Sequence, residues 1–230
     1  MLSQSDRITR YLDDVGALLY SLPRQPIHDI TEAILAAYRD SRTIYIIGNG
    51  GSASTATHFA CDLQKWTVRP GRPRLKAVAL TDNMALFSAW ANDDGYEQVF
   101  AEQLRTLLNP GDLVIAISCS GRSPNVLNAI RYAASSGAVT VGMTGYSGGE
   151  LVDLVDHCVV VRSERINQVE DVHMTICHLL ADVVRSTMTQ EDSGVLLARE
   201  AGGQYEAVIE ASSSMPEATL RAGKLRTTVE

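Results

Sequence analysis

The sequence predicts an α/β fold with a doubly wound, five-stranded and mainly parallel sheet flanked by helices. Five short segments rich in Val and Ile alternate with helical segments, and most of them are apolar on both faces. Strands buried on both sides of a parallel sheet have this composition, and β–α alternation is typical of doubly wound sheets. Clusters of glycine and serine follow two of the strands. Since ligands bind beyond the carboxyl ends of such strands, we expect a ligand site there.

The strands are expected at "TIYIIG", "LKAVAL", "DLVIAIS", "AVTVGMTG" and "HCVVV". Helices are expected between and after them at residues 52–65, 83–90, 96–108, 123–135 and about 168–188. Two further helices precede the first strand. The first covers residues 5–20, with Ser5 as its N-cap, and ends before Pro23; the second begins in "PIHDITEAILAAYRD". This N-terminal helical pair is expected to cover the sheet or to pack against another subunit.

The chain of 230 residues is long enough for one large α/β domain. We predict that this domain spans residues 1–188 and includes the N-terminal helical pair. Residues 189–230 differ, because two short apolar patches are separated by Gly-Gly and by a "SSSMP" break. This segment is interpreted as an appendage of unknown role.

Charge and composition exclude several classes of protein. The net charge is −7, with acids and bases interspersed and no basic block, which argues against nucleic acid as the main partner. No stretch approaches about 18 uninterrupted apolar residues, so no membrane span is expected. The N-terminus is charged from its sixth residue and shows no secretory signal. Four cysteines without CxxC spacing favour a reduced, cytoplasmic chain.

Two loops, each between a strand and a helix, are built to bind an anion. The first follows Gly48 and the second reads "SCSGRS". Glycines let the backbone approach an anion, the next helix offers free N–H groups and its positive dipole end, and serine hydroxyls donate further hydrogen bonds. The residues expected to bind the ligand are Asn49, Gly50, Gly51, Ser52, Ser118, Cys119, Ser120 and Ser123.

A dinucleotide site is the alternative for the first loop, since Gly48, Gly50 and Ala53 satisfy GxGxxA. That motif requires an acid about 20 residues further on, whereas Asp82 closes the second strand roughly 30 residues after the glycines. The second loop, with three serines around Gly121, suits the terminal phosphate of a small metabolite. The two loops together therefore favour a phosphate monoester.

Three separate segments, "GNGGSASTATHFACDL", "AISCSGRSPNVLNAI" and "VEDVHMTICHLLADVV", together resemble the sugar isomerase (SIS) domain, and specifically the sedoheptulose 7-phosphate isomerases, or phosphoheptose isomerases. The resemblance covers about residues 5–187. It implies a cytoplasmic homotetramer that interconverts sedoheptulose 7-phosphate and D-glycero-D-manno-heptose 7-phosphate. It also implies active sites between subunits and N-terminal helices that help to build the tetramer.

Aldose–ketose isomerisation requires a base that takes a carbon-bound proton and an acid that protonates the carbonyl oxygen, giving an enediol. His58 and Asp62 stand at i, i+4 on the helix after the first loop, so both project from one face. Glu170 and His178 lie eight residues apart in the last helix, about 80° apart around an ideal helix. His28 and His157 are interpreted as surface or structural histidines.

The resemblance implies that Asp62 and His178 are the base and the acid, and that His58, Asp62, Glu170 and His178 hold Zn²⁺ in some members of the family. This chain departs from the family in two places, because the usual glutamate is Asp62 and the usual glutamine is Glu170. Two histidines and two carboxylates are a reasonable zinc set. The substitutions leave the base open between Asp62 and Glu170, with Asp62 preferred.

The resemblance also adds residues that bind substrate. Asp93, in "WANDDGYEQVF", matches a position near the substrate's hydroxyls, and Glu170 lies at a position that contacts the substrate. Asp171 is a weaker candidate. Family members often hold Thr at the position of Cys119, so this chain lacks one hydroxyl there while the backbone N–H is retained.

Two other functions are alternatives to this one. One is another sugar-phosphate activity of the SIS type, such as arabinose 5-phosphate isomerisation or cleavage of a muramic acid phosphate ether. The other is a non-catalytic SIS protein that binds a replication initiator. Such proteins tend to lack the helical acid and the terminal histidine, whereas this chain retains Asp62 and His178, which favours catalysis.

Overall fold

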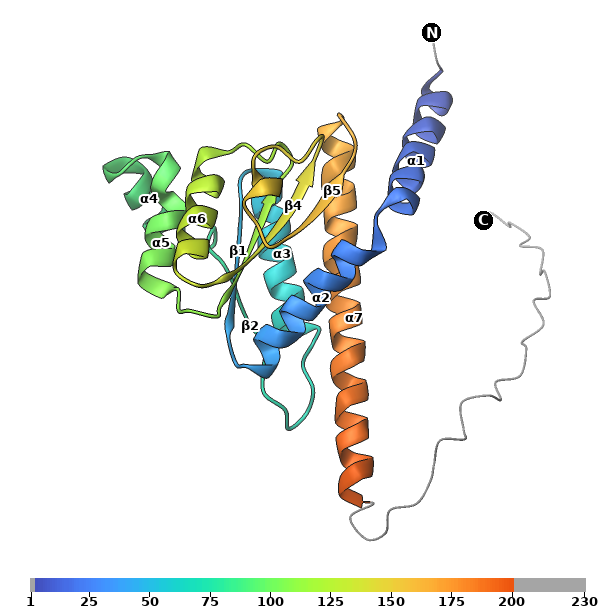
Figure 1. Ribbon diagram of the computed structural model, residues 1–230. Helices are drawn as coiled ribbons and strands as arrows, with labels where there is room; N and C mark the ends of the chain where they lie inside the picture. Colours follow the sequence, from blue (N-terminus) through green and yellow to red (C-terminus); the bar gives the residue numbers. More distant parts are fainter. Residues whose placement is uncertain (1–2, 201–230) are drawn as a thin grey trace, which may run out of the picture. The chain divides into compact units, whose positions relative to one another are not determined.

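The structure, a computed structural model, describes the backbone of residues 3–200 and the side chains of residues 3–193 (Figure 1). The chain divides into two units, residues 1–191 and residues 192–230. The fold and the site described below belong to the first unit.

Five parallel strands form one sheet in the order β2-β1-β3-β4-β5. They are β1 (Thr43–Gly48), β2 (Lys76–Ala79), β3 (Leu113–Ser118), β4 (Val139–Gly145) and β5 (His157–Val161). β3 and most of β1 and β4 are buried because their side chains are mainly apolar on both faces. β2, at the edge, alternates between exposed and buried residues. The predicted doubly wound, five-stranded parallel sheet is confirmed.

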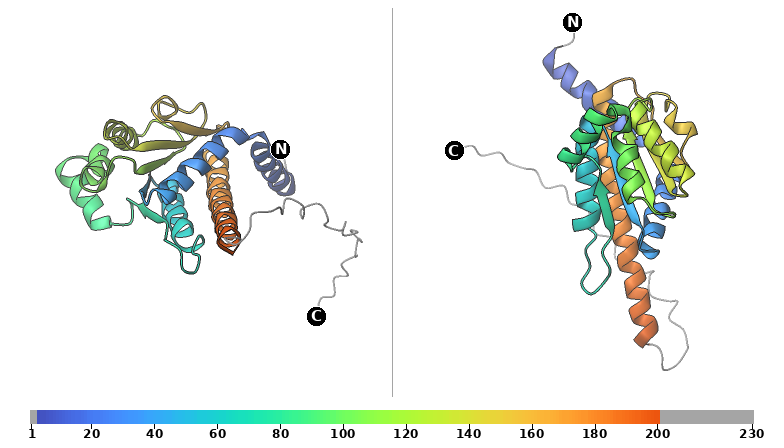
Figure 2. Two further views of the ribbon diagram at one scale, coloured as in Figure 1. Left: turned by 60° about the horizontal axis from the view of Figure 1, so that its bottom comes forward. Right: turned by 90° about the vertical axis from the view of Figure 1, so that its left-hand side faces the viewer.

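Helices cover both faces of the sheet (Figures 1 and 2). One core joins the sheet to α2 (Arg24–Arg39), α3 (Gly51–Lys65) and α7 (Ile166–Glu200), and α1 (Gln4–Ser21) packs on it through half-buried residues. The other core joins the opposite face to α4 (Met84–Asp93), α5 (Val99–Leu107) and α6 (Pro124–Ser135). The short helices η1 (Tyr96–Gln98) and η2 (Leu151–Asp153) complete the list of elements.

β2 lies on one side of β1, and β3 lies on the other side, followed by β4 and β5. The direction of winding therefore changes between β1 and β3. Gly48, at the end of β1, pairs with Ile117 near the end of β3. The two predicted anion loops follow these two strands. They therefore meet at the topological switch point, where doubly wound sheets bind their ligands.

The helix boundaries differ from the prediction in two informative places. Ser3, not Ser5, caps α1: its hydroxyl accepts the Asp6 N–H while the Asp6 carboxylate accepts the Ser3 N–H, a capping box that Ser5 cannot form from inside the helix. The last helix continues beyond residue 188 to Glu200. It passes Gly194 because a single interior glycine weakens a helix by only about 1 kcal/mol.

The predicted start of the appendage at residue 189 thus lies inside α7, and most of that segment, residues 201–230, falls outside the described residues. Within the described part of the chain, no helix is both long and apolar enough to cross a membrane.

Candidate active site

Both anion loops line a single open cavity of about 280 Å³ at the switch point. The eight loop residues predicted to bind the ligand all lie in its wall: Asn49, Gly50, Gly51, Ser52, Ser118, Cys119, Ser120 and Ser123. The structure thus brings together two segments about 70 residues apart in the sequence. Ile117, Tyr146, Ile166 and Glu170 complete the wall.

Two helix N-termini border this cavity. α3 begins at Gly51, and its N-cap residue Gly50 has a φ of 55° and no side chain to satisfy the first N–H groups. α6 begins at Pro124, and the hydroxyl of its N-cap residue Ser123 makes no capping hydrogen bond. Free N–H groups at the start of α3 and the positive ends of both helix dipoles are therefore available to a phosphate.

The charge of the cavity wall is unusual for a phosphate site. None of the described residues that line it is Lys, Arg or His, and Glu170 is its one charged side chain. The Glu170 carboxylate lies against the start of α3, where it fills the space that a Cβ on Gly51 would occupy. A phosphate in this cavity would be held by neutral N–H and O–H donors.

Cys119 is almost fully buried in the second loop. Burial raises the pKa of its thiol; a contact with the Ser52 hydroxyl, at 3.9 Å between Sγ and Oγ, opposes that rise, and the charge of Glu170 adds to it. The thiol is therefore protonated at neutral pH and supplies a weak hydrogen-bond donor beside Ser52.

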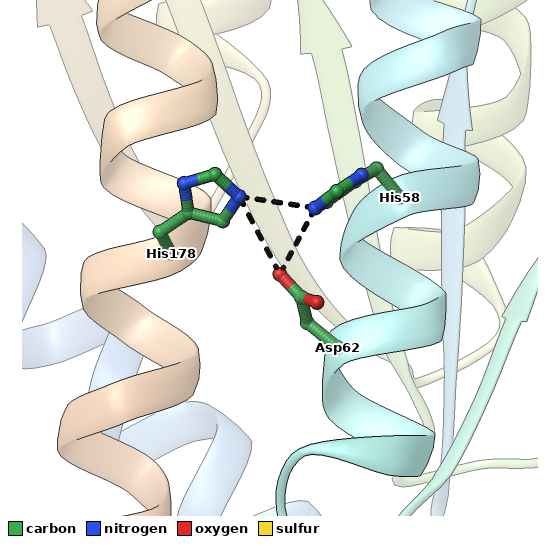
Figure 3. A group of neighbouring side chains, drawn as sticks. All are labelled: His58, Asp62 and His178. Carbon is green, nitrogen blue, oxygen red and sulfur yellow. Dashed lines mark hydrogen bonds and ion pairs between the residues drawn. The ribbon is translucent and has the colours of Figure 1, made fainter.

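His58, Asp62 and His178 form a second cluster, where α3 and α7 lie side by side (Figure 3). The Nε2 atoms of the two histidines are 3.0 Å apart. Asp62 Oδ2 lies 3.4 Å from His58 Nε2 and 3.7 Å from His178 Nε2. Both imidazoles are about half exposed and the carboxylate is less so, which leaves the cluster open to a ligand.

These distances fit a divalent metal ion. Two nitrogen or oxygen ligands about 2.0–2.1 Å from a tetrahedral zinc ion lie roughly 3.3 Å from each other. The three separations within the cluster bracket that value, and all three ligand atoms point toward one place. The structure thus holds a group of two histidines and one carboxylate that is suited to a metal.

Glu170, the fourth predicted metal ligand, does not belong to this group. It stands eight residues before His178, about 12 Å along the helix, and lines the anion cavity. Its role as a metal ligand therefore stays a prediction, whereas its carboxylate is placed where it would contact a bound sugar phosphate.

Two other predicted residues lie outside both groups. Asp93, at the exposed end of α4, accepts a hydrogen bond from the Asn92 amide and does not line the cavity. Asp171 is exposed and accepts a hydrogen bond of 2.6 Å from the Tyr11 hydroxyl. His28 is an exposed histidine beside Asp29, as expected for a residue without a role in the site.

The prediction missed Tyr146 and Asn125. Tyr146 follows β4, the next strand of the sheet, and lines the cavity with a φ of 53°. Asn125 is buried behind the second loop and contacts Asn49. Their positions directly after a strand and directly after the second loop are signals that could have identified them.

Comparison with known proteins decides the family. Residues 10–145 match the SIS domain family. A phosphoheptose isomerase from Roseiflexus sp. (strain RS-1) is 39% identical over 198 residues, which cover 83% of this chain and 100% of that protein. A phosphoheptose isomerase from Aquifex aeolicus (strain VF5) is 33% identical over 190 residues, covering 83% and 99% of the two chains. The chain belongs to the phosphoheptose isomerase family of SIS-domain proteins.

Solved structures of the phosphoheptose isomerase family share the fold. A phosphoheptose isomerase from Francisella tularensis superposes with a TM-score of 0.75 at 29% identity, covering 80% of this chain and 100% of that one. A phosphoheptose isomerase from Neisseria gonorrhoeae gives a TM-score of 0.74 at 27% identity, with the same coverage. The predicted family resemblance is confirmed.

Proposed function

We propose that this chain is a sedoheptulose 7-phosphate isomerase. It interconverts D-sedoheptulose 7-phosphate and D-glycero-D-manno-heptose 7-phosphate, or a close heptose 7-phosphate, through an enediol. Besides the family, one observation carries this proposal: α3 runs from the anion cavity to the His58–Asp62–His178 cluster. Ser52 and His58 are about 9 Å apart along the helix, a distance comparable to an extended seven-carbon chain of roughly 8 Å.

Substrate binding sets the direction of the sugar. The phosphate binds in the cavity, where two helix N-termini and several hydroxyls supply neutral donors. The sugar chain then extends along α3, past Glu170, and places its carbonyl end at the cluster. This arrangement keeps the reacting carbons beside groups that transfer protons.

The cluster supplies a base and an acid. Asp62, the less exposed member, takes the proton from the carbon next to the carbonyl group, while His178 donates a proton to the carbonyl oxygen, and the enediol forms. A proton then returns to the former carbonyl carbon, and the hydroxyl group on the neighbouring carbon loses its proton to become the new carbonyl group, which completes the exchange of aldose and ketose. Glu170 is the alternative base, since its carboxylate lines the anion cavity at the start of α3.

We also propose that His58, Asp62 and His178 hold one Zn²⁺ per active site. The predicted fourth ligand, Glu170, lies about 12 Å along α7 from His178 and lines the anion cavity instead. Two imidazoles and a carboxylate at these separations are ligands that zinc prefers. A zinc ion bound through His178 Nε2 would take the place of the proton donor there, because it would polarise the carbonyl group and stabilise negative charge on the enediolate oxygens.

We further propose that the protein is a cytoplasmic homotetramer with active sites between subunits. In support, α1 buries none of its residues and exposes Ile8 (57%) and Leu12 (65%). Asp93 lies outside the cavity of its own chain, as expected of a residue that serves a neighbouring subunit. All four cysteines are free, which suits a reducing compartment.

The activity is tested by mixing the protein with sedoheptulose 7-phosphate and following heptose 7-phosphate by NMR, with and without added Zn²⁺. A panel of five- to seven-carbon sugar phosphates separates this activity from other sugar-phosphate isomerisations. Absence of turnover under both conditions would contradict the proposal. Binding of a replication protein by a chain without isomerase activity would favour the non-catalytic alternative.

His178→Gln should lower kcat by about 10²–10⁴-fold and change KM little, because loss of a general acid acts on the chemical step. His28→Gln is the matched control, since His28 is an exposed helical histidine far from the cavity in sequence and outside its wall. The control should keep the wild-type kcat and KM. Undiminished turnover by His178→Gln would remove His178 from the mechanism.

Zinc should raise the melting temperature of the wild-type protein, because an ion that binds only the folded state stabilises it. The double variant His58→Gln/His178→Gln should lose that shift and show at least about 100-fold weaker zinc binding by calorimetry, since ligand loss at a metal site is costly. His28→Gln again serves as the control. Equal zinc affinity of the wild type and the double variant would place the metal elsewhere.

A further inference from the structure

Two asparagines join the two anion loops across the switch point. Asn49 lies in the first loop and Asn125 is the second residue of α6, directly after the second loop. Each side-chain amide donates to the carbonyl oxygen of the other, with both Nδ2–Oδ1 distances 2.9 Å. Asn125 is 1% exposed. Such a reciprocal pair in a buried place fixes the relative position of the two segments.

The orientation of both amides follows from one backbone group. The Val126 N–H can only donate, and it donates to Asn125 Oδ1 at 3.0 Å. Asn125 Nδ2 must therefore donate to Asn49 Oδ1, and Asn49 Nδ2 must donate to Asn125 Oδ1. The Tyr96 hydroxyl donates a further hydrogen bond of 3.0 Å to Asn49 Oδ1. Three contacts thus hold the Asn49 amide, and one Nδ2 hydrogen of a cavity-lining residue is left for a ligand.

Tyr96 is itself held in place. Its ring packs edge to face on Phe87, with ring centroids 5.8 Å apart. The Asn128 amide of α6 donates to the carbonyl oxygen of Glu97, the next residue of η1, at 3.2 Å. The first loop, η1 and α6 therefore meet at Asn49.

We propose that Asn125 and Tyr96 are positioning residues for phosphate binding. They hold the Asn49 amide with its remaining N–H toward the anion and set the spacing of the two loops. This inference rests on the proposed function, in which the substrate's phosphate binds in that cavity. Because none of the described residues in the wall is basic, neutral donors hold the anion, and their preorganised direction determines affinity.

The test measures binding of inorganic phosphate by calorimetry together with KM and kcat for the sugar phosphate. Tyr96→Phe should raise the Kd for phosphate and the KM about 3–10-fold and leave kcat within about twofold, since one hydrogen bond to a positioning amide is lost. Asn125→Ala should raise both constants by at least about tenfold. Tyr20→Phe is the control, because Tyr20 is 87% exposed on α1, and it should bind phosphate like the wild type.

Tyr96→Phe keeps the proposal testable if Asn125→Ala folds poorly, because Tyr96 is 52% exposed and the ring contact with Phe87 is retained. Lower melting temperatures with unchanged phosphate affinity would show a merely structural role and overturn the inference. Wild-type protein that binds phosphate without isomerase turnover would contradict the proposed function alone. Wild-type protein that does not bind phosphate would contradict both.

Discussion

Cys119 illustrates, at the scale of the residue, how position in the fold sets the chemistry of a side chain. A loop between a strand and a helix usually exposes its residues, yet Cys119 is buried because the loop turns under the start of α3 and faces Ser52. Burial raises the pKa of the thiol, and the charge of Glu170 raises it further. Cys119 therefore contributes shape and a weak donor to the anion cavity rather than a nucleophile.

Thiol labelling should distinguish the cysteines of the native protein. Iodoacetamide reacts with thiolates, so Cys61, which is exposed on α3, should be alkylated at neutral pH while Cys119 and Cys177 are protected. Burial, and to a smaller extent the charge of Asp62, raises the pKa of the Cys177 thiol as well. Peptide mass spectrometry measures the extent at each site.

Protein unfolded in urea is the control for this labelling, and all four cysteines should react in it. Labelling of Cys119 in the native protein at a rate near that of Cys61 would mean that the second loop opens readily. That result would contradict the buried position of the Cys119 thiol.

In α7, three side chains perform different tasks along the length of the helix. Glu170 lines the anion cavity, His178 joins the cluster with α3, and His173 lies between them at the sheet. His173 is almost fully buried, and its Nε2 lies 3.1 Å from the carbonyl oxygen of Thr144 near the end of β4. This contact fixes α7 against the sheet, and thereby the positions of the other two side chains.

His173 should make the protein less stable at mildly acidic pH. Burial lowers the pKa of this histidine from 6.5 to about 4. The unfolded chain therefore binds a proton between these values that the folded chain does not bind. The contribution of the neutral His173 to the free energy of unfolding is full above pH 6.5 and is lost as the pH falls toward 4. The loss at pH 5 is on the order of 2 kcal/mol.

Urea unfolding at pH 7.5, 6 and 5 measures this effect, with His173→Gln as the comparison because glutamine retains an N–H donor and does not titrate. The variant should be less stable than the wild type at pH 7.5, but the difference should narrow by about 2 kcal/mol at pH 5. Parallel pH profiles for the two proteins would show that His173 is not the titrating group.

Sequence patterns predicted the elements whose signals are local. β1 and β3 are apolar on both faces, and the glycines of the first loop and Pro124 mark the starts of α3 and α6. The end of α7 was predicted at about residue 188, whereas α7 continues to Glu200. Helix ends depend on weak local preferences, and tertiary packing overrides them.

The parts of the candidate site that depend on local patterns were also predictable from the sequence. Spacing placed His58 and Asp62 on one face of a helix, and loop composition identified the cavity wall. The convergence of His178 with His58 depends on how α7 packs against α3, which no local pattern records. For the same reason the sequence could not separate Glu170 from the His–Asp–His cluster or pair Asn125 with Asn49.

At the scale of the whole molecule, the winding of the sheet creates the site. Strand order β2-β1-β3-β4-β5 brings the ends of β1 and β3 together, and the two anion loops extend from these ends. The last helix then adds Glu170 and His178 from a segment that follows every strand. All residues of the anion cavity and of the His58–Asp62–His178 cluster lie in the first unit, residues 1–191.

Residues 201–230 should therefore be dispensable for isomerisation. The Roseiflexus phosphoheptose isomerase aligns over its whole length with 83% of this chain. A chain ending at residue 200 retains α7 as described, including Met188, the last buried apolar core residue among those whose side chains the structure describes. We expect its kcat and KM to stay within about twofold of the values of the full chain. Its melting temperature should stay within about 4 °C, which corresponds to a change of about 1–2 kcal/mol in the free energy of unfolding for a protein of this size. Steady-state kinetics and calorimetry on the two proteins measure both quantities, and a tenfold loss of kcat/KM on truncation would assign residues 201–230 a part in the enzyme.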